Sequence, residues 1–483
     1  MALLISFLVY HFKHDNKSNF RIPVNGFTIL LFGFVSSVAL ISSHRNYAFK
    51  ATSTGDIISY LGSAWALLLF IILLVMVLKS TGRVFYNRLL KKYLPNNYLL
   101  DISLGLIAFT LALFVLGLFG GIQQNTIIAL MFGFSLINLF YLVQSLKRLL
   151  FKSIDVSGIG ILGIVSFCVL IFYLLLNYLS ILAPFPSGFD SRNFYVNISQ
   201  LVADNHGLVK GYQPYYWSLL MSIGFALFEK IELALGLSFL GIVLSLLAAY
   251  RLAIRHLKLE KDIVLFLLCL FTVTPAVTNQ MYIELKVDFA MLFFQLVCLD
   301  YSLILFKRFY KIVEESSIRD IASQLMPLVI LLGLLSSFAL GIKMINMFMV
   351  FTILVLFWWN SKNIFGTLAV LAFSLLLFLF AGIDEVSGLN KYHLSESTVK
   401  WVLFILMIVG FVLSFIKHRK ATVIRGYLTA VYIFCCGILV MPWMIKNYSE
   451  TRSLNPRTLL MGKDPGPGIG LNDIINNFNN KTQ

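Results

Sequence analysis

Long apolar runs separated by short polar segments make up most of the chain. An α-helix needs about 20 predominantly apolar residues to cross the hydrocarbon core of a bilayer. On this criterion the hydrophobic pattern predicts an all-α polytopic membrane protein with about thirteen transmembrane helices. The predicted spans are 24–43, 56–78, 98–119, 122–145, 157–183, 231–253, 262–280, 284–306, 323–340, 344–359, 363–382, 399–416 and 424–445.

One apolar stretch, 214–228, is too short for a span, begins with aromatic residues and ends at Glu229 and Lys230. This pattern is typical of a helix that lies in the membrane interface. We therefore predict a juxtamembrane helix here, on the outer side of the membrane.

Basic residues collect in alternate loops, which the positive-inside rule assigns to the cytoplasm. They are Lys13, Lys17 and Arg21; Arg83, Arg88, Lys91 and Lys92; Lys147, Arg148 and Lys152; Arg251, Arg255, Lys258 and Lys261; Lys307, Arg308, Lys311 and Arg319; Lys362; and Lys417, Arg419 and Lys420. With these loops inside, the long polar segment 184–217 lies on the extracytoplasmic side. The same arrangement brings residues 284–288, the 341–343 turn and the chain after Pro442 to that side.

Composition narrows the class of protein. Hydrophobic residues make up 59% of the chain and charged residues only 12%, whereas soluble domains have roughly 25% charged residues. The net charge of +16 is explained by the cytoplasmic loops, so we expect no nucleic-acid partner. The five cysteines all fall inside apolar segments and show neither a disulfide framework nor zinc-ligand spacing.

The segment 184–217 carries the first candidate chemistry, because ionisable groups at a membrane boundary are costly and usually functional. It contains Asp190, Arg192 and His206. Asp190 could be a catalytic carboxylate, or it could cap an amphipathic helix predicted near 191–203. His206 could be a base or a ligand, although a hydrogen-bonding role within the loop is the simpler interpretation.

A second group of charges begins the predicted span 284–306. Glu284 and Asp288 are spaced i and i+4, so one helix face could present both carboxylates. Lys343 and Arg192 are the predicted cationic partners, and the alternative is a cluster of charges at the lipid headgroups. Lys343 itself is a lone ammonium at the predicted outer surface, where it could bind a phosphate or act as a snorkelling anchor.

Five motifs, in order, resemble the polytopic glycosyltransferases of the GT-C fold, which use polyprenyl-phosphate sugars. The motifs are SGFDSRNFYV, GYQPYYWSLLMSIGFALF, TPAVTNQMYIELKVDFAMLFF, GLLSSFALGIK and PWMIKNYSETRSLNP, within roughly 157–460. The resemblance implies that Asp190 is the general base, that Asp288 is a second acid, and that Lys343 holds the donor phosphate.

These observations predict an inverting glycosyltransferase that moves a sugar from a polyprenyl-phosphate donor to a hydroxyl of a glycan, lipid or protein. We expect four N-terminal helices (1–156), a GT-C-like catalytic module (157–446) and an extracytoplasmic tail (447–483). The expected location is a bacterial inner membrane, with the active site facing the periplasm or exterior.

The remaining site residues have supporting roles in this prediction. Arg192 assists Lys343 at the phosphate, and Glu284, His206 and Tyr212 contact the acceptor or a metal ion. No cofactor is required, although Asp190, Glu284 and Asp288 could hold a divalent cation. The alternative function is a secondary transporter or lipid flippase, but such proteins often have internal repeats and ionisable groups at mid-membrane, and the sequence shows neither.

Overall fold

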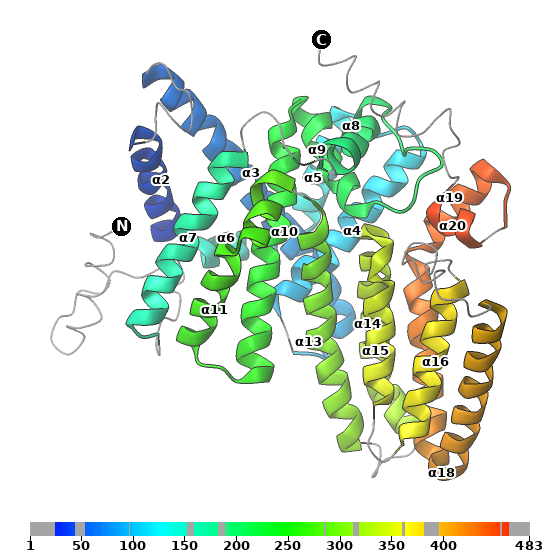
Figure 1. Ribbon diagram of the computed structural model, residues 1–483. Helices are drawn as coiled ribbons and strands as arrows, with labels where there is room; N and C mark the ends of the chain where they lie inside the picture. The colour runs from blue at the N-terminus through cyan, green and yellow to red at the C-terminus, as the bar shows by residue number, and fades with distance from the viewer. Residues whose placement is uncertain are drawn as a thin grey trace. The chain divides into compact units, whose positions relative to one another are not determined.

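The computed structural model describes residues 25–43, 54–95, 97–151, 159–181, 188, 191–284, 286–312, 318–359, 363–380, 396–454 and 456–462. All regular secondary structure in these ranges is helical, without a β-strand (Figure 1). The α-helices are α2 (Gly26–Ser43), α3 (Thr54–Phe85), α4 (Tyr98–Leu118), α5 (Gln124–Ile137), α6 (Leu139–Phe151), α7 (Ile161–Ile181), α8 (Val196–Asp204), α9 (Tyr216–Phe228), α10 (Ile231–Leu252), α11 (Lys261–Val273), α12 (Pro275–Thr278), α13 (Asp288–Ile312), α14 (Ile318–Ile342), α15 (Met347–Trp358), α16 (Ile364–Phe380), α18 (Glu396–Ile438), α19 (Met441–Thr451) and α20 (Pro456–Met461).

The described helices confirm a polytopic membrane protein. Seven are long and apolar enough to cross a bilayer, and the number rises to nine if each of two bent helix pairs forms one span. Shorter apolar helices include α2, α9, α15 and α16. The total of thirteen spans therefore stays a prediction.

The predicted span 122–145 is not one straight helix. It divides into α5 and α6, whose axes differ by 84°. Asn138 lies at the break, where its side-chain amide donates to the carbonyl of Phe134 at 2.7 Å and to the hydroxyl of Thr81 at 2.8 Å. A side chain that caps the preceding turn in this way stabilises the end of α5.

The predicted span 262–280 is also bent, by 66° between α11 and α12. Proline has no N–H to donate and its ring disfavours a helical conformation in the residue before it. Thr274, which precedes Pro275, accordingly has extended backbone angles (φ −65°, ψ 138°). The sequence therefore encodes this bend directly.

Helix α18 has 43 residues, which would extend about 65 Å if straight, roughly twice the hydrocarbon thickness. It instead bends at His418, where the backbone leaves helical geometry (φ −139°, ψ 49°). The hydroxyls of Ser414 and Thr422 lie 2.8 Å apart across the bend. The chain therefore turns back on itself, and Figure 1 shows α18 as two adjacent legs.

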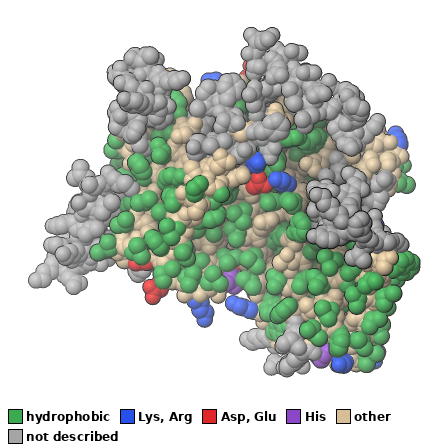
Figure 2. All heavy atoms as spheres, viewed as in Figure 1, with side chains coloured by type: hydrophobic (Ala, Val, Ile, Leu, Met, Phe, Trp, Pro, Cys, Tyr) green, Lys and Arg blue, Asp and Glu red, His purple; other side chains and the backbone are tan. Residues whose placement is uncertain are grey.

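The helices expose large apolar side chains on their outer faces, and Figure 2 shows hydrophobic groups over much of the visible surface. Along α18, Trp401 is 63% exposed and Phe434 is 73% exposed. Extended apolar surface of this kind marks an interaction with a partner or a membrane. Together with the helix lengths, it indicates that lipid surrounds these helices.

The chain forms two compact units. The first comprises 1–89, 96–208 and 217–293, and the second comprises 90–95, 209–216 and 294–483. In the first unit, Gly82 and Gly105 bring α3 and α4 so close that a Cβ at either position would clash with the other backbone. In the second unit, a Cβ at Gly333 of α14 would clash with the Cβ of Cys435 of α18. Small residues at such crossings allow close helix packing in membranes.

Candidate functional site

Three of the predicted site residues have side chains outside the described part of the structure. Asp190 lies outside it entirely. Arg192 belongs to a π-helical turn, η2 (Ser191–Tyr195), and Glu284 ends another, η4 (Asn279–Glu284), but neither side chain is described. The roles assigned to these residues stay predictions.

The expectation that Glu284 and Asp288 share one helix face is wrong. The π-helical turn ends at Glu284, and the backbone of Lys286 and Val287 is not helical. Asp288 is the first residue of α13 and is half-buried. A carboxylate in the first turn of a helix interacts favourably with the free N–H groups and the positive end of the helix dipole, which explains why the helix begins at this acid.

His206 contacts a neighbouring loop within the first unit. Its ring Nδ1 lies 3.2 Å from the carbonyl of Ile122, and its own carbonyl accepts the N–H of Ile122 at 2.9 Å. Its backbone is left-handed, with φ 54°. These contacts join two loops, as expected from the hydrogen-bonding interpretation of this histidine.

The second unit contains Tyr212 and Lys343, and it brings their segments together with the chain after Pro442. We call the shared contact region the Tyr216 cluster. It consists of Tyr215, Tyr216, Phe338, Trp443, Lys446 and Glu450.

The loop 209–216 is closed by Tyr215. The N–H of Val209 donates to the Tyr215 phenol oxygen at 2.7 Å, and the Tyr215 ring lies 5.9 Å from that of Tyr212. Tyr215 is only 3% exposed. Burial raises the pKa of this phenol far above its usual value, so Tyr215 is protonated at neutral pH and orders the loop that presents Tyr212.

The turn that carries Lys343 packs against Tyr216. The Tyr216 ring stacks on Phe338 of α14, with ring centroids 5.0 Å apart and an interplanar angle of 9°. At Gly341 a Cβ would clash with the same ring, so only glycine permits this approach. The Tyr216 hydroxyl donates to the carbonyl of Leu439 at 2.6 Å, which connects Tyr216 to the residue that follows α18.

Asn346 holds the backbone next to Lys343 in place. Its side-chain amide donates to the carbonyl of Ala339 at 2.6 Å, and its amide oxygen accepts from Gln295 at 2.8 Å. Asn346 is fully buried, whereas Lys343 is half-buried. A rigid backbone therefore supports a cation that keeps partial access to its surroundings.

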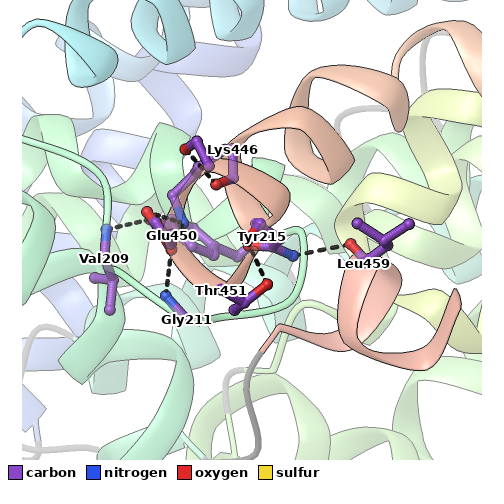
Figure 3. A network of polar contacts seen from close by, with 9 residues as sticks. Val209, Gly211, Tyr215, Lys446, Glu450, Thr451 and Leu459 are labelled. Carbon is purple, nitrogen blue, oxygen red and sulfur yellow. Dashed lines mark hydrogen bonds and ion pairs between the residues drawn. The ribbon is translucent and has the colours of Figure 1, made fainter. Parts of the chain in front are cut away.

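An ion pair on α19, between the buried Lys446 and the more exposed Glu450, completes the cluster. The Lys446 ammonium lies 3.0 and 3.1 Å from the two carboxylate oxygens of Glu450, one turn further along the helix. Glu450 also accepts the N–H of Gly211 at 2.7 Å (Figure 3). The carboxylate thus connects α19 to the loop 209–216.

Burial governs the electrostatics of Lys446, which is 6% exposed. It lowers the pKa of Lys446, and the attraction of Glu450, which acts in the opposite direction, does not fully offset it. The nearby Lys210 lowers this pKa further. The ammonium is therefore held in an environment that favours an additional negative group.

Asn447, next to Lys446, is fully buried and connects α19 to α20. Its side-chain amide donates to the carbonyl of Leu459 of α20 at 3.0 Å. Among the described residues, no group donates a hydrogen bond to its amide oxygen. Asn447 therefore offers an acceptor beside the ion pair.

The motif PWMIKNYSETRSLNP includes Lys446, Asn447 and Glu450, but sequence reasoning assigned none of them a role. The signal for the ion pair was nevertheless present, since Lys446 and Glu450 stand at i and i+4. The hydrogen bond between Glu450 and Gly211 had no such signal, because it joins residues 239 positions apart.

Within the described ranges, no group of three or more His, Cys, Asp or Glu side chains is placed to hold a metal ion. No protein-family model matches the chain, and neither the curated proteins nor the solved structures contain a match.

Proposed function

We propose that this protein is a membrane glycosyltransferase that moves a sugar from a polyprenyl-phosphate donor to an acceptor hydroxyl on the extracytoplasmic side. In this reaction Asp190 takes the proton of the acceptor hydroxyl, and the oxygen attacks the anomeric carbon. The bond between that carbon and the phosphate oxygen breaks, and polyprenyl phosphate leaves. A single displacement of this kind inverts the configuration at the anomeric carbon.

The convergence of three motifs supports the proposal. The Tyr-Pro-rich loop 209–216, the Gly341–Lys343 turn and the Pro-Trp helix α19 are far apart in sequence, yet they pack around Tyr216. Each of these segments also carries part of the resemblance to glycosyltransferases of the GT-C fold. Motifs that build a single site must lie close together in the fold. Their shared contact region is in keeping with such a site.

The chemistry of a lipid-linked donor assigns the remaining roles. Its phosphate lies at the membrane interface while its hydrocarbon chain stays in the bilayer, so the enzyme needs a cation at headgroup depth. Lys343 is the proposed phosphate ligand, assisted by Arg192, and it stabilises the charge that grows on the leaving phosphate. Asp288 is the proposed second acid, and Tyr212 is a proposed contact to the acceptor.

Titration with polyprenyl phosphate tests the role of Lys343. We expect Lys343→Ala to weaken binding to detergent-purified protein by roughly tenfold or more, the loss of one charge-assisted contact. Lys343→Arg should restore part of the affinity, because it keeps the charge but changes the geometry. Lys230→Ala is the matched control. This exposed lysine follows the juxtamembrane helix 214–228, so it is predicted to lie on the same side of the membrane as Lys343.

A snorkelling anchor gives the opposite result. Lys343→Ala would then lower the yield of folded protein, but the folded fraction would bind polyprenyl phosphate as tightly as the wild type. Equal affinities would remove Lys343 from the donor site.

A further inference from the structure

The first unit contains a polar cavity of about 220 Å³ that is separate from the proposed transferase residues. Four helices supply its charged lining, namely α3, α4, α6 and α10. The charged residues that line it are Lys79, Arg83, Asp101, Arg148 and Arg251.

Helix geometry explains why these side chains meet. Lys79 and Arg83 are one turn apart on α3, so they share a helix face. Asp101 lies in the first turn of α4, whereas Arg148 and Arg251 lie in the last turns of α6 and α10. Arg83, Asp101, Arg148 and Arg251 are therefore near helix ends. The three arginines belong to three of the basic groups predicted to face the cytoplasm.

The charges around the cavity are unbalanced. Cationic side chains outnumber carboxylates by four to one among the described lining residues. Like charges that converge in a partly enclosed space repel one another unless an anion joins them. Basic pockets between transmembrane helices on the cytoplasmic side are known to bind phosphate-bearing lipid headgroups.

Two buried atoms of residues that line the cavity could form hydrogen bonds with a ligand. Arg83 Nη1 lies 3.6 Å from Asp101 Oδ2, which is an ion pair but longer than a hydrogen bond. Within the described part of the chain, neither Arg83 Nη1 nor Asp101 Oδ1 has a hydrogen-bond partner, and the Asp101 side chain is only 2% exposed. Because an unpaired buried polar group is costly, the site favours a ligand with both an acceptor and a donor.

We propose that this cavity binds a phosphate ester that carries a free hydroxyl group, as a glycerophosphate does. The phosphate oxygens accept hydrogen bonds from Arg83, Arg148, Arg251 and Lys79. The hydroxyl donates to Asp101. The ligand is either the headgroup of an anionic lipid or a soluble ester, and the site does not depend on the proposed transfer reaction.

Binding of short-chain lipids to the delipidated, detergent-purified full-length protein tests this site. We expect short-chain phosphatidylglycerol to bind at least about tenfold more tightly than phosphatidylcholine with the same acyl chains. Arg148→Gln should weaken phosphatidylglycerol binding about tenfold. Arg148 is exposed, so this variant is expected to fold.

Lys147→Gln is the matched control, because it removes the same charge from the adjacent exposed residue, which does not line the cavity. It should change the affinity less than about twofold. Equal effects of the two variants, or equal binding of the two lipids, would overturn the proposal.

Soluble probes identify the source of the ligand. Glycerol phosphate that binds as tightly as the lipid would support the site and assign it to a soluble ester, whereas lipid binding without glycerol phosphate binding would assign it to a membrane lipid. If the ligand is a soluble ester, inorganic phosphate should bind more weakly than glycerol phosphate. The wild type should prefer phosphatidylglycerol to phosphatidic acid, which lacks the glycerol hydroxyls. Asp101→Asn should reduce this preference, and an unchanged preference would overturn the role of the hydroxyl.

Discussion

The carboxylate of Glu450 accepts the backbone N–H of Gly211 at 2.7 Å, although the two residues are 239 positions apart in the chain. Glu450 also pairs with the buried Lys446. One side chain thus neutralises a buried cation and connects helix α19 to the loop that presents Tyr212. This relationship makes the Tyr216 cluster sensitive to changes at Glu450.

We expect Glu450→Gln to destabilise the protein by about 1.5–3 kcal/mol, the contribution of a hydrogen bond to a charged group. The amide keeps the shape of the side chain, but it leaves the Lys446 charge buried without its counter-charge. The midpoint of thermal unfolding in detergent measures the loss. Glu260→Gln, at an exposed glutamate before α11, is the control, and an equal shift in both variants would contradict the importance of the pair.

Gly341→Ala should disturb the support of Lys343. The added methyl group would clash with the ring of Tyr216, and overpacking of this kind costs about 1–3 kcal/mol. Gly426→Ala is the matched control, because no described atom lies within 4 Å of a Cβ at that helical position. It should leave the stability unchanged or raise it by up to about 1 kcal/mol, and equal unfolding midpoints for the two variants would show that the contact with Tyr216 does not matter.

Lys446 predicts a dependence of stability on pH. Because burial lowers its pKa in the folded protein below the usual 10.5, the unfolded chain binds the proton more readily between the two pKa values. Burying the charged Lys446 side chain therefore costs free energy at neutral pH. That cost falls as the pH rises towards 10.5, because the unfolded chain then also loses its proton. Wild-type protein should gain stability relative to Lys446→Met over this range, as measured by unfolding midpoints at several pH values. A relative loss would mean that Glu450 raises the pKa of Lys446 overall.

The apolar runs of the sequence were sufficient to predict a helical membrane protein, because crossing a bilayer demands long apolar helices. The bend at Pro275 was also encoded locally, through the missing N–H of proline. The bend at Asn138 was not, because it involves a tertiary hydrogen bond to Thr81. The break before Asp288 was not predictable from local sequence either, because the i, i+4 spacing of Glu284 and Asp288 also fits a continuous helix.

The candidate site was predictable to a similar extent. Lys343 could be selected because a lone cation at a membrane surface leaves a trace in sequence, whereas the Pro-Trp motif was selected only by its resemblance to glycosyltransferases of the GT-C fold. Their meeting at Tyr216 could not be derived, since it depends on ring stacking with Phe338 and on the space left by Gly341. Such packing follows from the three-dimensional arrangement of helices and not from local spacing.

The proposed orientation can be tested by thiol labelling in intact cells. Lys210→Cys should react with a membrane-impermeant reagent from outside, whereas Lys91→Cys should react only after permeabilisation, because the basic loops are predicted to face the cytoplasm. Both lysines are exposed, and four of the five native cysteines are buried. The reverse labelling pattern would contradict the proposed topology.

Release of polyprenyl phosphate from a panel of polyprenyl-phosphate sugars tests the proposed function most directly. Purified wild-type protein with a membrane extract as the source of acceptor should release the lipid phosphate from at least one donor. Asp190→Asn should slow that release by about 10²–10⁴-fold while it still binds polyprenyl phosphate, because the amide cannot accept the proton. Wild-type rates for Asp190→Asn would remove Asp190 from the mechanism, and no release from any donor by folded wild-type protein would contradict the proposed transferase.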